Sequence, residues 1–312
     1  MIGYDIVGDI HGQAKELAAL LSKIGYQQDN NGLFSHATRK VIFLGDFIDR
    51  GSQQKRTIEI VRPMIESGNA LSVIGNHEFN AIAYYLKSNE TGEYLRKHSE
   101  KNWDQHKEFL AEFEDDAQLY KSTIEWFMTL PFWLEIDGFR VVHACWDSVW
   151  IKRIKEELDG KPFLNEALMV KASNKDCWEF DAIERLLKGK EIPLKPGISF
   201  NDNDGVPRQH IRVRWWDKSA TTFKAAYIGP ENAITQIPDD ETGGDHLIDY
   251  SHKELPVFLG HYWMTGEPEP LADNIACVDY SVANKKGKLV AYQWDGEQTL
   301  SSDKFVWVDR AD

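Results

Sequence analysis

The sequence predicts an α/β fold, because short apolar strands and helical patterns alternate through roughly its first 90 residues. A second observation concerns chemistry: five short apolar runs each end in a residue that can bind a metal or move a proton. The chain has 312 residues, 42% of them hydrophobic, which is ample for a buried core. In open α/β sheets, function gathers where strands end, since the sheet holds the following loops rigidly.

Strand and helix signals follow one another from the N-terminus. Short β-branched runs bounded by glycine predict buried strands, and apolar residues at helical spacing predict helices. The expected elements are a strand over 2–7, a helix over 17–24, a strand over 41–44, a helix over 53–66, a strand over 70–74 and a helix from about 78. A turn-rich stretch at 29–32 predicts the tip of a hairpin. This order favours a sequential, mostly parallel arrangement.

The middle of the chain is less regular. Residues 91–130 are polar and helical. Residues 132–142 predict a tight hairpin, since Asp137-Gly138 between apolar runs favours a type I′ turn. Residues 145–255 combine charged helical segments with Gly- and Asp-rich loops, which predicts an insertion. Strands are expected again at 257–259, 275–279, 288–294 and 305–308.

Composition limits the partners. The formal net charge is −14 and no basic stripe is present to neutralise phosphates, which argues against a nucleic-acid duplex as the main partner. A small phosphorylated substrate still fits, because bound cations can reverse the local potential. Cys145, Cys177 and Cys277 lack CxxC spacing, as expected for buried thiols in a reducing compartment. With no leader pattern and no apolar stretch near the ~20 residues of a membrane span, we expect a cytoplasmic protein without a membrane partner.

The polar residues at the strand ends form a candidate metal site. They are Asp9 and His11, then Asp46 and Asp49, then Asn76 and His77, and finally His143 and His261. Asp9 and His11 lie two residues apart, so their side chains point to the same side of an extended segment. Asp46 offers a carboxylate that could bridge two ions ~3.5–4 Å apart. Carboxylate, amide and imidazole without thiolate favour manganese, iron or zinc.

Three of these stretches resemble the signatures of one enzyme family. Gly8–Gly12 is Gly-Asp-Ile-His-Gly, Gly45–Gly51 is Gly-Asp-Phe-Ile-Asp-Arg-Gly, and Gly75–Glu78 is Gly-Asn-His-Glu. In order and spacing they are similar to three motifs of the calcineurin-like metallophosphoesterases. The long second motif most resembles the branch that holds the serine/threonine phosphoprotein phosphatases and the symmetrical diadenosine tetraphosphatases. His143 and the Gly260-His261 pair match the later metal-binding histidines.

The resemblance implies a fold and a ligand set. The fold would be a single domain over residues 1–312, a four-layer α/β sandwich of two mixed sheets flanked by helices, with a cap-like insertion at 145–255. One divalent ion would be held by Asp9, His11 and Asp46. The second would be held by Asp46, Asn76, His143 and His261. Manganese is the first choice for both ions, with iron or zinc as alternatives.

The same resemblance implies the catalytic roles. His77 would protonate the leaving group, Asp49 would orient its ring, and Arg50 would bind the substrate phosphate with its planar fork. A hydroxide held between the two ions would attack the phosphorus directly. Arg212 and Arg214 share one face of a strand-like run and could supply a further phosphate contact, or could be structural anchors. The other six histidines lie in polar contexts and are expected to be solvated.

The predicted function is metal-dependent hydrolysis of phosphomonoesters, similar to that of serine/threonine protein phosphatases. The substrate would be a phosphoprotein, a small phosphomonoester or a nucleotide. A symmetrical dinucleoside polyphosphate hydrolase is the first alternative, because the motifs are shared. A non-catalytic binding module is the second, and the complete ligand set argues against it. The sequence departs from the family pattern twice: no second histidine follows His261 two residues later, and Ala144-Cys145 replaces two glycines after His143.

Overall fold

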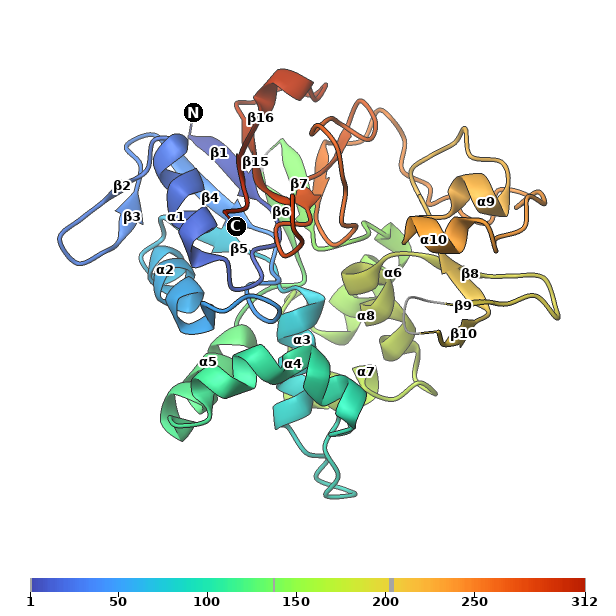
Figure 1. Cartoon of the computed structure of the whole chain (residues 1–312), viewed down its shortest axis with the longest axis horizontal. Coiled ribbons are helices and arrows are strands. Elements are labelled where there is room, and N and C mark those ends of the chain that lie inside the picture. The colour runs from blue at the N-terminus through green and yellow to red at the C-terminus, as the bar shows by residue number, and fades with distance from the viewer. Residues whose placement is uncertain (1, 137, 202–204, 312) are drawn as a thin grey trace.

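The computed structural model describes residues 2–136, 138–201 and 205–311 and contains two mixed β-sheets packed face to face (Figure 1). In the first sheet the strand order is β14, β15, β1, β4, β5, and β16 also pairs with β15. Its strands are β1 (Gly3–Val7), β4 (Arg39–Phe43), β5 (Ala70–Ser72), β14 (Asp279–Tyr280), β15 (Lys288–Trp294) and β16 (Phe305–Asp309). In the second sheet the order is β13, β12, β7, β6. Its strands are β6 (Trp133–Ile136), β7 (Phe139–Val142), β12 (Val257–Leu259) and β13 (Ile275–Cys277).

Helices cover the outer face of each sheet, so the four-layer α/β sandwich is confirmed (Figure 1). The first sheet is covered by α1 (Ala14–Lys23) and α2 (Gln54–Glu66). The second sheet is covered by α6 (Ser148–Glu157), α7 (Glu166–Ala172) and α8 (Trp178–Lys188). A third group packs beside the sandwich: α3 (Asn76–Tyr85), α4 (Glu100–Phe113) and α5 (Ala117–Phe127).

Successive side chains of the central strands enter two different cores. Val7, Val41 and Phe43 pack against the helices, whereas Ile6 and Ile42 pack between the two sheets. This division follows from the period of two in a strand. Because both faces are buried, the strands are continuous apolar runs, and each such side chain stabilises the fold by roughly 1.5–3 kcal/mol.

The parallel strands bring their carboxyl ends to one edge. β1, β4 and β5 run parallel and in register, with Val7 beside Phe43 and Phe43 beside Ser72. In the second sheet β7 and β12 are also parallel. His143 directly follows β7, and His261 follows β12 after one glycine. The loops that leave these five strands are therefore neighbours, as expected where chemistry collects in such sheets.

The latter part of the long connection between β7 and β12 forms a lobe with an apolar core of its own. Its core contains Ile192, Ile211, Val213, Phe223 and Tyr227. The lobe lies at the right of Figure 1 and contains β8 (Glu191–Pro193), β9 (Phe200–Asn201), β10 (Pro207–Arg208), β11 (His210–Arg212), α9 (Phe223–Ala226) and α10 (Glu231–Ile234). The earlier part holds α6 to α8, which belong to the outer helical layer. A single insertion over residues 145–255 remains a prediction.

Most expected elements are present within a few residues of their predicted bounds. The two hairpins are confirmed: β2 (Gln27–Gln28) pairs with β3 (Phe34–Ser35), and β6 pairs with β7. The type I′ turn predicted at Asp137 lies outside the described residues. A short 3-10 helix, η1 (Ser302–Lys304), precedes β16. No helix in the described part of the chain is long and apolar enough to span a membrane.

Candidate metal and active site

Left-handed backbone conformations concentrate in the signature loops. Nine non-glycine residues among those described have a positive φ. Five of them are candidate site residues: His11, Asp46, Asp49, Arg50 and His261, with φ between 48° and 70°. Each such conformation costs on the order of 1–3 kcal/mol and persists only where the surroundings impose it. Strain gathered in this way is typical of a functional site.

The loops after β4 and β5 touch backbone to backbone. A Cβ atom added to Gly45 would lie 2.2 Å from the backbone nitrogen of Gly75. A Cβ atom added to Gly75 would lie 2.2 Å from Oδ1 of Asp46. Glu78 locks this contact, because its carboxylate accepts hydrogen bonds from the backbone N–H groups of Asp46, Phe47 and Gly75 at 2.7, 2.8 and 3.0 Å. Both positions therefore require glycine, because the two loops approach each other too closely to leave room for a Cβ atom.

The Asp46 carboxylate lies at the centre of the site. Its Oδ2 is 3.5 Å from Nε2 of His143, 3.7 Å from Nε2 of His11 and 3.9 Å from Nε2 of His77. Its Oδ1 accepts a hydrogen bond of 2.9 Å from the backbone N–H of His77. A buried carboxylate with imidazoles on both sides has the position expected of a bridging ligand.

Asn76 joins the two histidines from the second sheet. Its Oδ1 lies 2.7 Å from Nδ1 of His261 and 3.2 Å from Nε2 of His143. Nδ1 of His143 donates to the backbone carbonyl of Leu44 at 2.6 Å, which leaves the lone pair of a neutral ring on Nε2. That lone pair faces Asn76 Oδ1 and Asp46 Oδ2. Converging acceptors of this kind suit a bound cation.

Three buried acceptor atoms around Asp46 have no hydrogen-bond partner among the described residues. They are Oδ1 of Asp9, Nε2 of His11 and Nε2 of His261. Nδ1 of His11 donates to the carbonyl of Ile48 at 2.9 Å, so its Nε2 carries the free lone pair. Burial, and then the neighbouring Asp279, raise the pKa of Asp9. Leaving such groups unpaired costs free energy, which divalent ions would recover.

Two groups of possible ligands have atoms within 4.8 Å of one another. One contains Asp46, His143 and His261, and the other contains His11, Asp46 and His77. The first agrees with the ligands predicted for the second ion. In the other group His77 stands where the sequence analysis placed Asp9. The individual ligand assignments therefore remain predictions, whereas the donor set itself fits two divalent ions.

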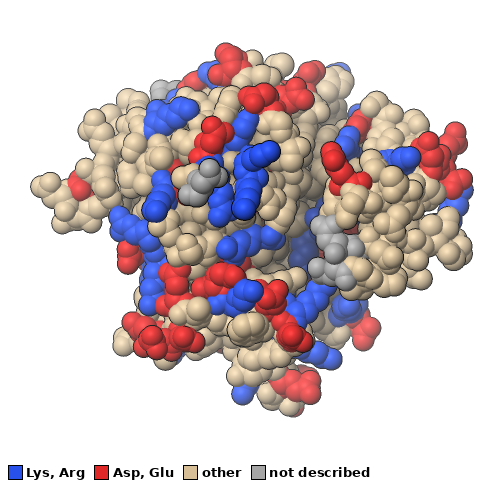
Figure 2. Space-filling view, in the orientation of Figure 1, with Lys and Arg blue, Asp and Glu red and all other residues tan. Residues whose placement is uncertain are grey.

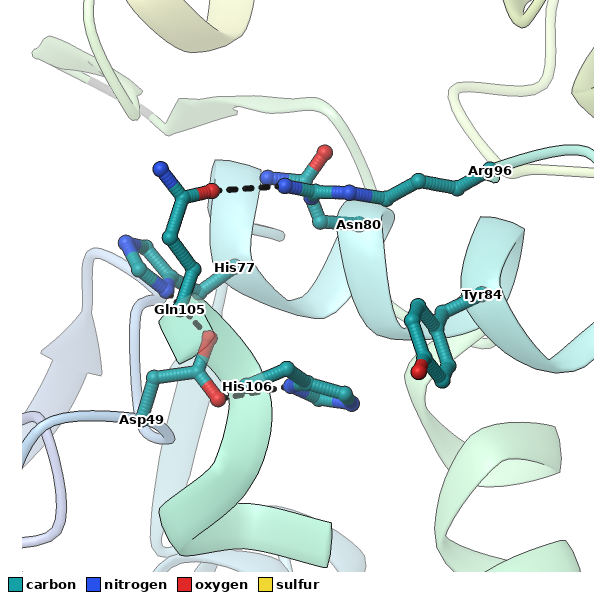
Figure 3. A pocket seen from close by; sticks show the side chains of 7 residues that line it. All are labelled: Asp49, His77, Asn80, Tyr84, Arg96, Gln105 and His106. Atoms are coloured by element: carbon teal, nitrogen blue, oxygen red, sulfur yellow. Dashed lines mark hydrogen bonds and ion pairs between the residues drawn. The ribbon is translucent and has the colours of Figure 1, made fainter. Parts of the chain in front are cut away.

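Asp49 lies between two imidazoles. Its Oδ2 is 2.5 Å from Nδ1 of His77, and its Oδ1 is 2.7 Å from Nδ1 of His106 (Figure 3). Burial alone would raise the pKa of Asp49, but His106 and His77 outweigh it and hold that pKa below its ordinary range. The His77 side chain is 12% exposed, so it is the member of this group that reaches the solvent side.

The two arginines of the lobe differ in burial: Arg212 is partly buried, whereas Arg214 is exposed. Arg212 acts on His261: burial, and then the Arg212 charge, lower the pKa of His261. Arg214 is exposed, and its charge acts on Asp217 at the surface. In Figure 2, Lys and Arg side chains lie in the hollow that separates the lobe from the rest of the molecule. The lobe therefore adds positive charge near the site although the whole chain is acidic.

Arg50 is placed by an aromatic ring. Its guanidinium carbon lies 3.9 Å from the ring centroid of Trp263, a cation–π contact. The backbone N–H of Trp263 donates to Oδ2 of Asp279 at 2.7 Å, which fixes the loop after His261. Trp263 stands where a second histidine is absent, and this role had no signal in the sequence.

Residues 4–274 match the family described as calcineurin-like phosphoesterase. The chain belongs to this family. This family consists of phosphoester hydrolases, and the predicted place of the chain among such enzymes is confirmed. The fold of a cold-active protein-tyrosine phosphatase from a Shewanella species is similar, with a TM-score of 0.50, 16% identity, and coverage of 100% of this chain and 81% of that one.

Two curated relatives are named asymmetrical bis(5'-nucleosyl)-tetraphosphatases. That of Oceanobacillus iheyensis is 30% identical over 45% of this chain and 54% of its own length. That of Bacillus subtilis is 39% identical over 28% of this chain and 36% of its own length. The match thus spans between about a third and about half of these relatives.

One buried histidine of this site was not predicted from the sequence. His106 was expected to be solvated, yet it is 5% exposed and bonds Asp49. A signal was available: His106, Phe109 and Phe113 recur at helical spacing and form one buried face of α4. His246, also expected in solvent, is buried in the lobe and bonds the backbone carbonyl of Asp217.

Proposed function

We propose that this phosphoesterase hydrolyses phosphomonoesters with the help of two divalent ions. The observation that carries the proposal is the Asp46 carboxylate, with imidazole nitrogens at 3.5–3.9 Å on several sides. Ions bound there would lower the pKa of a coordinated water and neutralise charge on the phosphoryl oxygens. Manganese is the ion we propose first, and iron and zinc are alternatives that the same carboxylate, amide and imidazole donors also suit.

The protein side chains would complete the reaction. Arg50, held against Trp263, would bind the phosphoryl oxygens from one side, and Arg212 from the lobe would add positive charge from the other. As the bond between phosphorus and the leaving oxygen breaks, its electron pair stays on that oxygen. The proton on Nε2 of His77 would then pass to it. Asp49 accepts a hydrogen bond from Nδ1 of His77 and so orients the ring.

Cleavage of dinucleoside polyphosphates is the second candidate, and the names of the curated relatives support it. Those names specify asymmetrical cleavage, whereas the sequence analysis considered the symmetrical kind. The net charge of −14 supports monoesters, since a polyanion would be repelled from most of the surface. Salt weakens that argument, because it screens charges that lie farther apart than the Debye length, so the choice between the two substrates needs a direct assay.

A side-by-side assay tests the proposal. The chelated protein would be reloaded with manganese, iron or zinc and given p-nitrophenyl phosphate, a phosphopeptide and diadenosine tetraphosphate at moderate salt. We expect higher kcat/KM for the monoesters and no turnover without added metal. Full activity after thorough chelation would contradict the metal-dependent mechanism. A higher kcat/KM for the dinucleotide would favour the second candidate.

Arg212 and Arg214 form a matched pair for testing the phosphate contact. We expect Arg212→Ala to raise KM for p-nitrophenyl phosphate by roughly tenfold, as loss of a charged hydrogen bond implies. Arg214→Ala should leave KM unchanged, because that side chain is exposed and faces Asp217. Equal effects of the two substitutions would show that Arg212 is a structural anchor.

A further inference from the structure

The Asp49 carboxylate has two imidazole partners, and the role proposed for its pair with His77 leaves the second partner, His106, unexplained. His106 comes from α4, a helix outside the three signature loops. Its Nδ1 lies 2.7 Å from Oδ1 of Asp49, while Oδ2 of the same carboxylate faces His77 (Figure 3). Each oxygen thus has its own imidazole, so the plane of the carboxylate is fixed.

The surroundings of the other ring nitrogen, Nε2, indicate which nitrogen of His106 carries the proton. Nε2 is buried and has no hydrogen-bond partner among the described residues. A proton there would be an unsatisfied buried donor, which costs on the order of 1–3 kcal/mol. The ring packs between Phe109 at 4.9 Å and Tyr84 at 5.4 Å, measured between ring centroids. The neutral ring with its proton on Nδ1 satisfies all of these contacts, and Nδ1 then donates to Asp49.

A second contact ties α4 to the same loop. The carboxylate of Glu112 accepts hydrogen bonds from the backbone N–H groups of Gln54 and Lys55 at 2.7 and 2.8 Å. These residues begin α2, where free N–H groups and the helix dipole favour a negative charge. His106 and Glu112 therefore hold the segment from Asp49 to the start of α2 at two places.

We infer that His106 is a positioning residue for the proton donor His77. By donating to Oδ1 it fixes the Asp49 carboxylate, so that Oδ2 stays aimed at Nδ1 of His77 and holds the ring toward the leaving group. The inference rests on the proposed function, because it assigns His77 the task of protonation. It concerns the delivery of that proton and requires no direct contact between His106 and the substrate.

Substrates with different leaving groups distinguish a role of His106 in positioning His77 from a general structural role. His106→Leu removes the donor at similar volume, so we expect kcat for phenyl phosphate to fall about tenfold, the loss of one charge-assisted bond. For 2,4-dinitrophenyl phosphate, whose leaving group needs no proton, kcat should change by less than about threefold. His106→Asn keeps an N–H donor near the Nδ1 position and should restore most of the lost kcat. KM should change little in either variant.

Two controls and an independent readout complete the test. Glu112→Gln weakens the other α4 contact and should not produce the leaving-group dependence. Combined with Asp49→Asn, the change His106→Leu should cause no further loss, because both act through one bond. The N–H proton shared by His77 and Asp49 should appear far downfield in the proton NMR spectrum and move in His106→Leu. This readout needs no turnover, so it remains informative if the proposed function fails.

Equal losses of kcat for both substrates would overturn the inference, since they would indicate a purely structural role. So would an unchanged downfield resonance in His106→Leu. If His106→Asn is as impaired as His106→Leu, ring packing and not hydrogen bonding is responsible, which also overturns the inference.

Discussion

The Asp46 carboxylate lies next to several of the other site residues. Its Oδ2 faces three imidazoles, and its Oδ1 holds the backbone of His77. The sequence indicated that Asp46 could bridge two ions, because it offers a carboxylate at the end of a strand. The structure adds that Asp46 also orders the start of α3.

Asp46→Asn should lower the occupancy of both metal positions. Replacing the negative oxygen by an amide removes charge from both ions together, so activity should fall further than for any other single ligand change. Metal content measured by mass spectrometry after dialysis checks this. If only one of two bound ions is lost, Asp46 is not a bridge.

His77→Asn should lose turnover while keeping its metals. General-acid help contributes about 10²–10⁴-fold, and the loss should shrink for substrates with good leaving groups. The competing possibility is that His77 is a ligand, since its Nε2 lies 3.9 Å from Asp46 Oδ2. Metal content that falls in step with activity would support that possibility and contradict the assignment as proton donor.

Asp49 should make the metal-free protein sensitive to acid. Its pKa in the folded protein is held below the ordinary value, so the stability it contributes is present above roughly pH 4 and is lost as pH falls further. Asp49→Asn removes this contribution. We expect the variant to be less stable than wild type near neutral pH and the difference to narrow toward roughly pH 3. Thermal melts of chelated proteins across this range measure it, and a constant difference would contradict it.

At the scale of elements, the fold depends on close contact between the loops after β4 and β5. Gly75 has a φ of −95°, which any residue can adopt, so glycine is needed there for steric reasons and not for its backbone conformation. Gly68 has a φ of +77° and open space around it. Substitutions at these two positions therefore distinguish the cost of steric crowding from the cost of backbone strain.

Gly75→Ala should destabilise the protein more than Gly68→Ala. Overpacking of a rigid contact costs roughly 1–3 kcal/mol or more, and the added methyl would collide with Asp46 Oδ1. For Gly68 the cost is only that of the backbone conformation, about 1 kcal/mol. Urea unfolding of both variants compares the free energies, and Gly75→Ala should also weaken metal binding. A smaller cost at Gly75 would show that the two loops can separate.

For the whole molecule, the sequence was most informative where structure is local. Each strand is a short apolar run, and the polar residue and the glycines that follow it lie in the same short segment. The roles of His106, Trp263 and Arg212 depend on contacts between distant parts of the chain. His106 reaches a residue 57 positions earlier, and no local pattern specifies that pairing. The charge of Arg212 acts on His261 only because the lobe packs against the rest of the chain. The contacts of Trp215 with Ala144 and Tyr262 show this packing.

The ligands of the metal site come from both sheets. Asp9, His11, Asp46 and Asn76 follow strands of the first sheet, and His143 and His261 follow strands of the second. Each ion that joins both sets would act as a cross-link between two layers that otherwise meet through apolar side chains. Metal occupancy would then add to the free energy of unfolding in proportion to the logarithm of ion concentration over Kd. Metal supply would therefore determine both the stability of the sandwich and its catalytic activity.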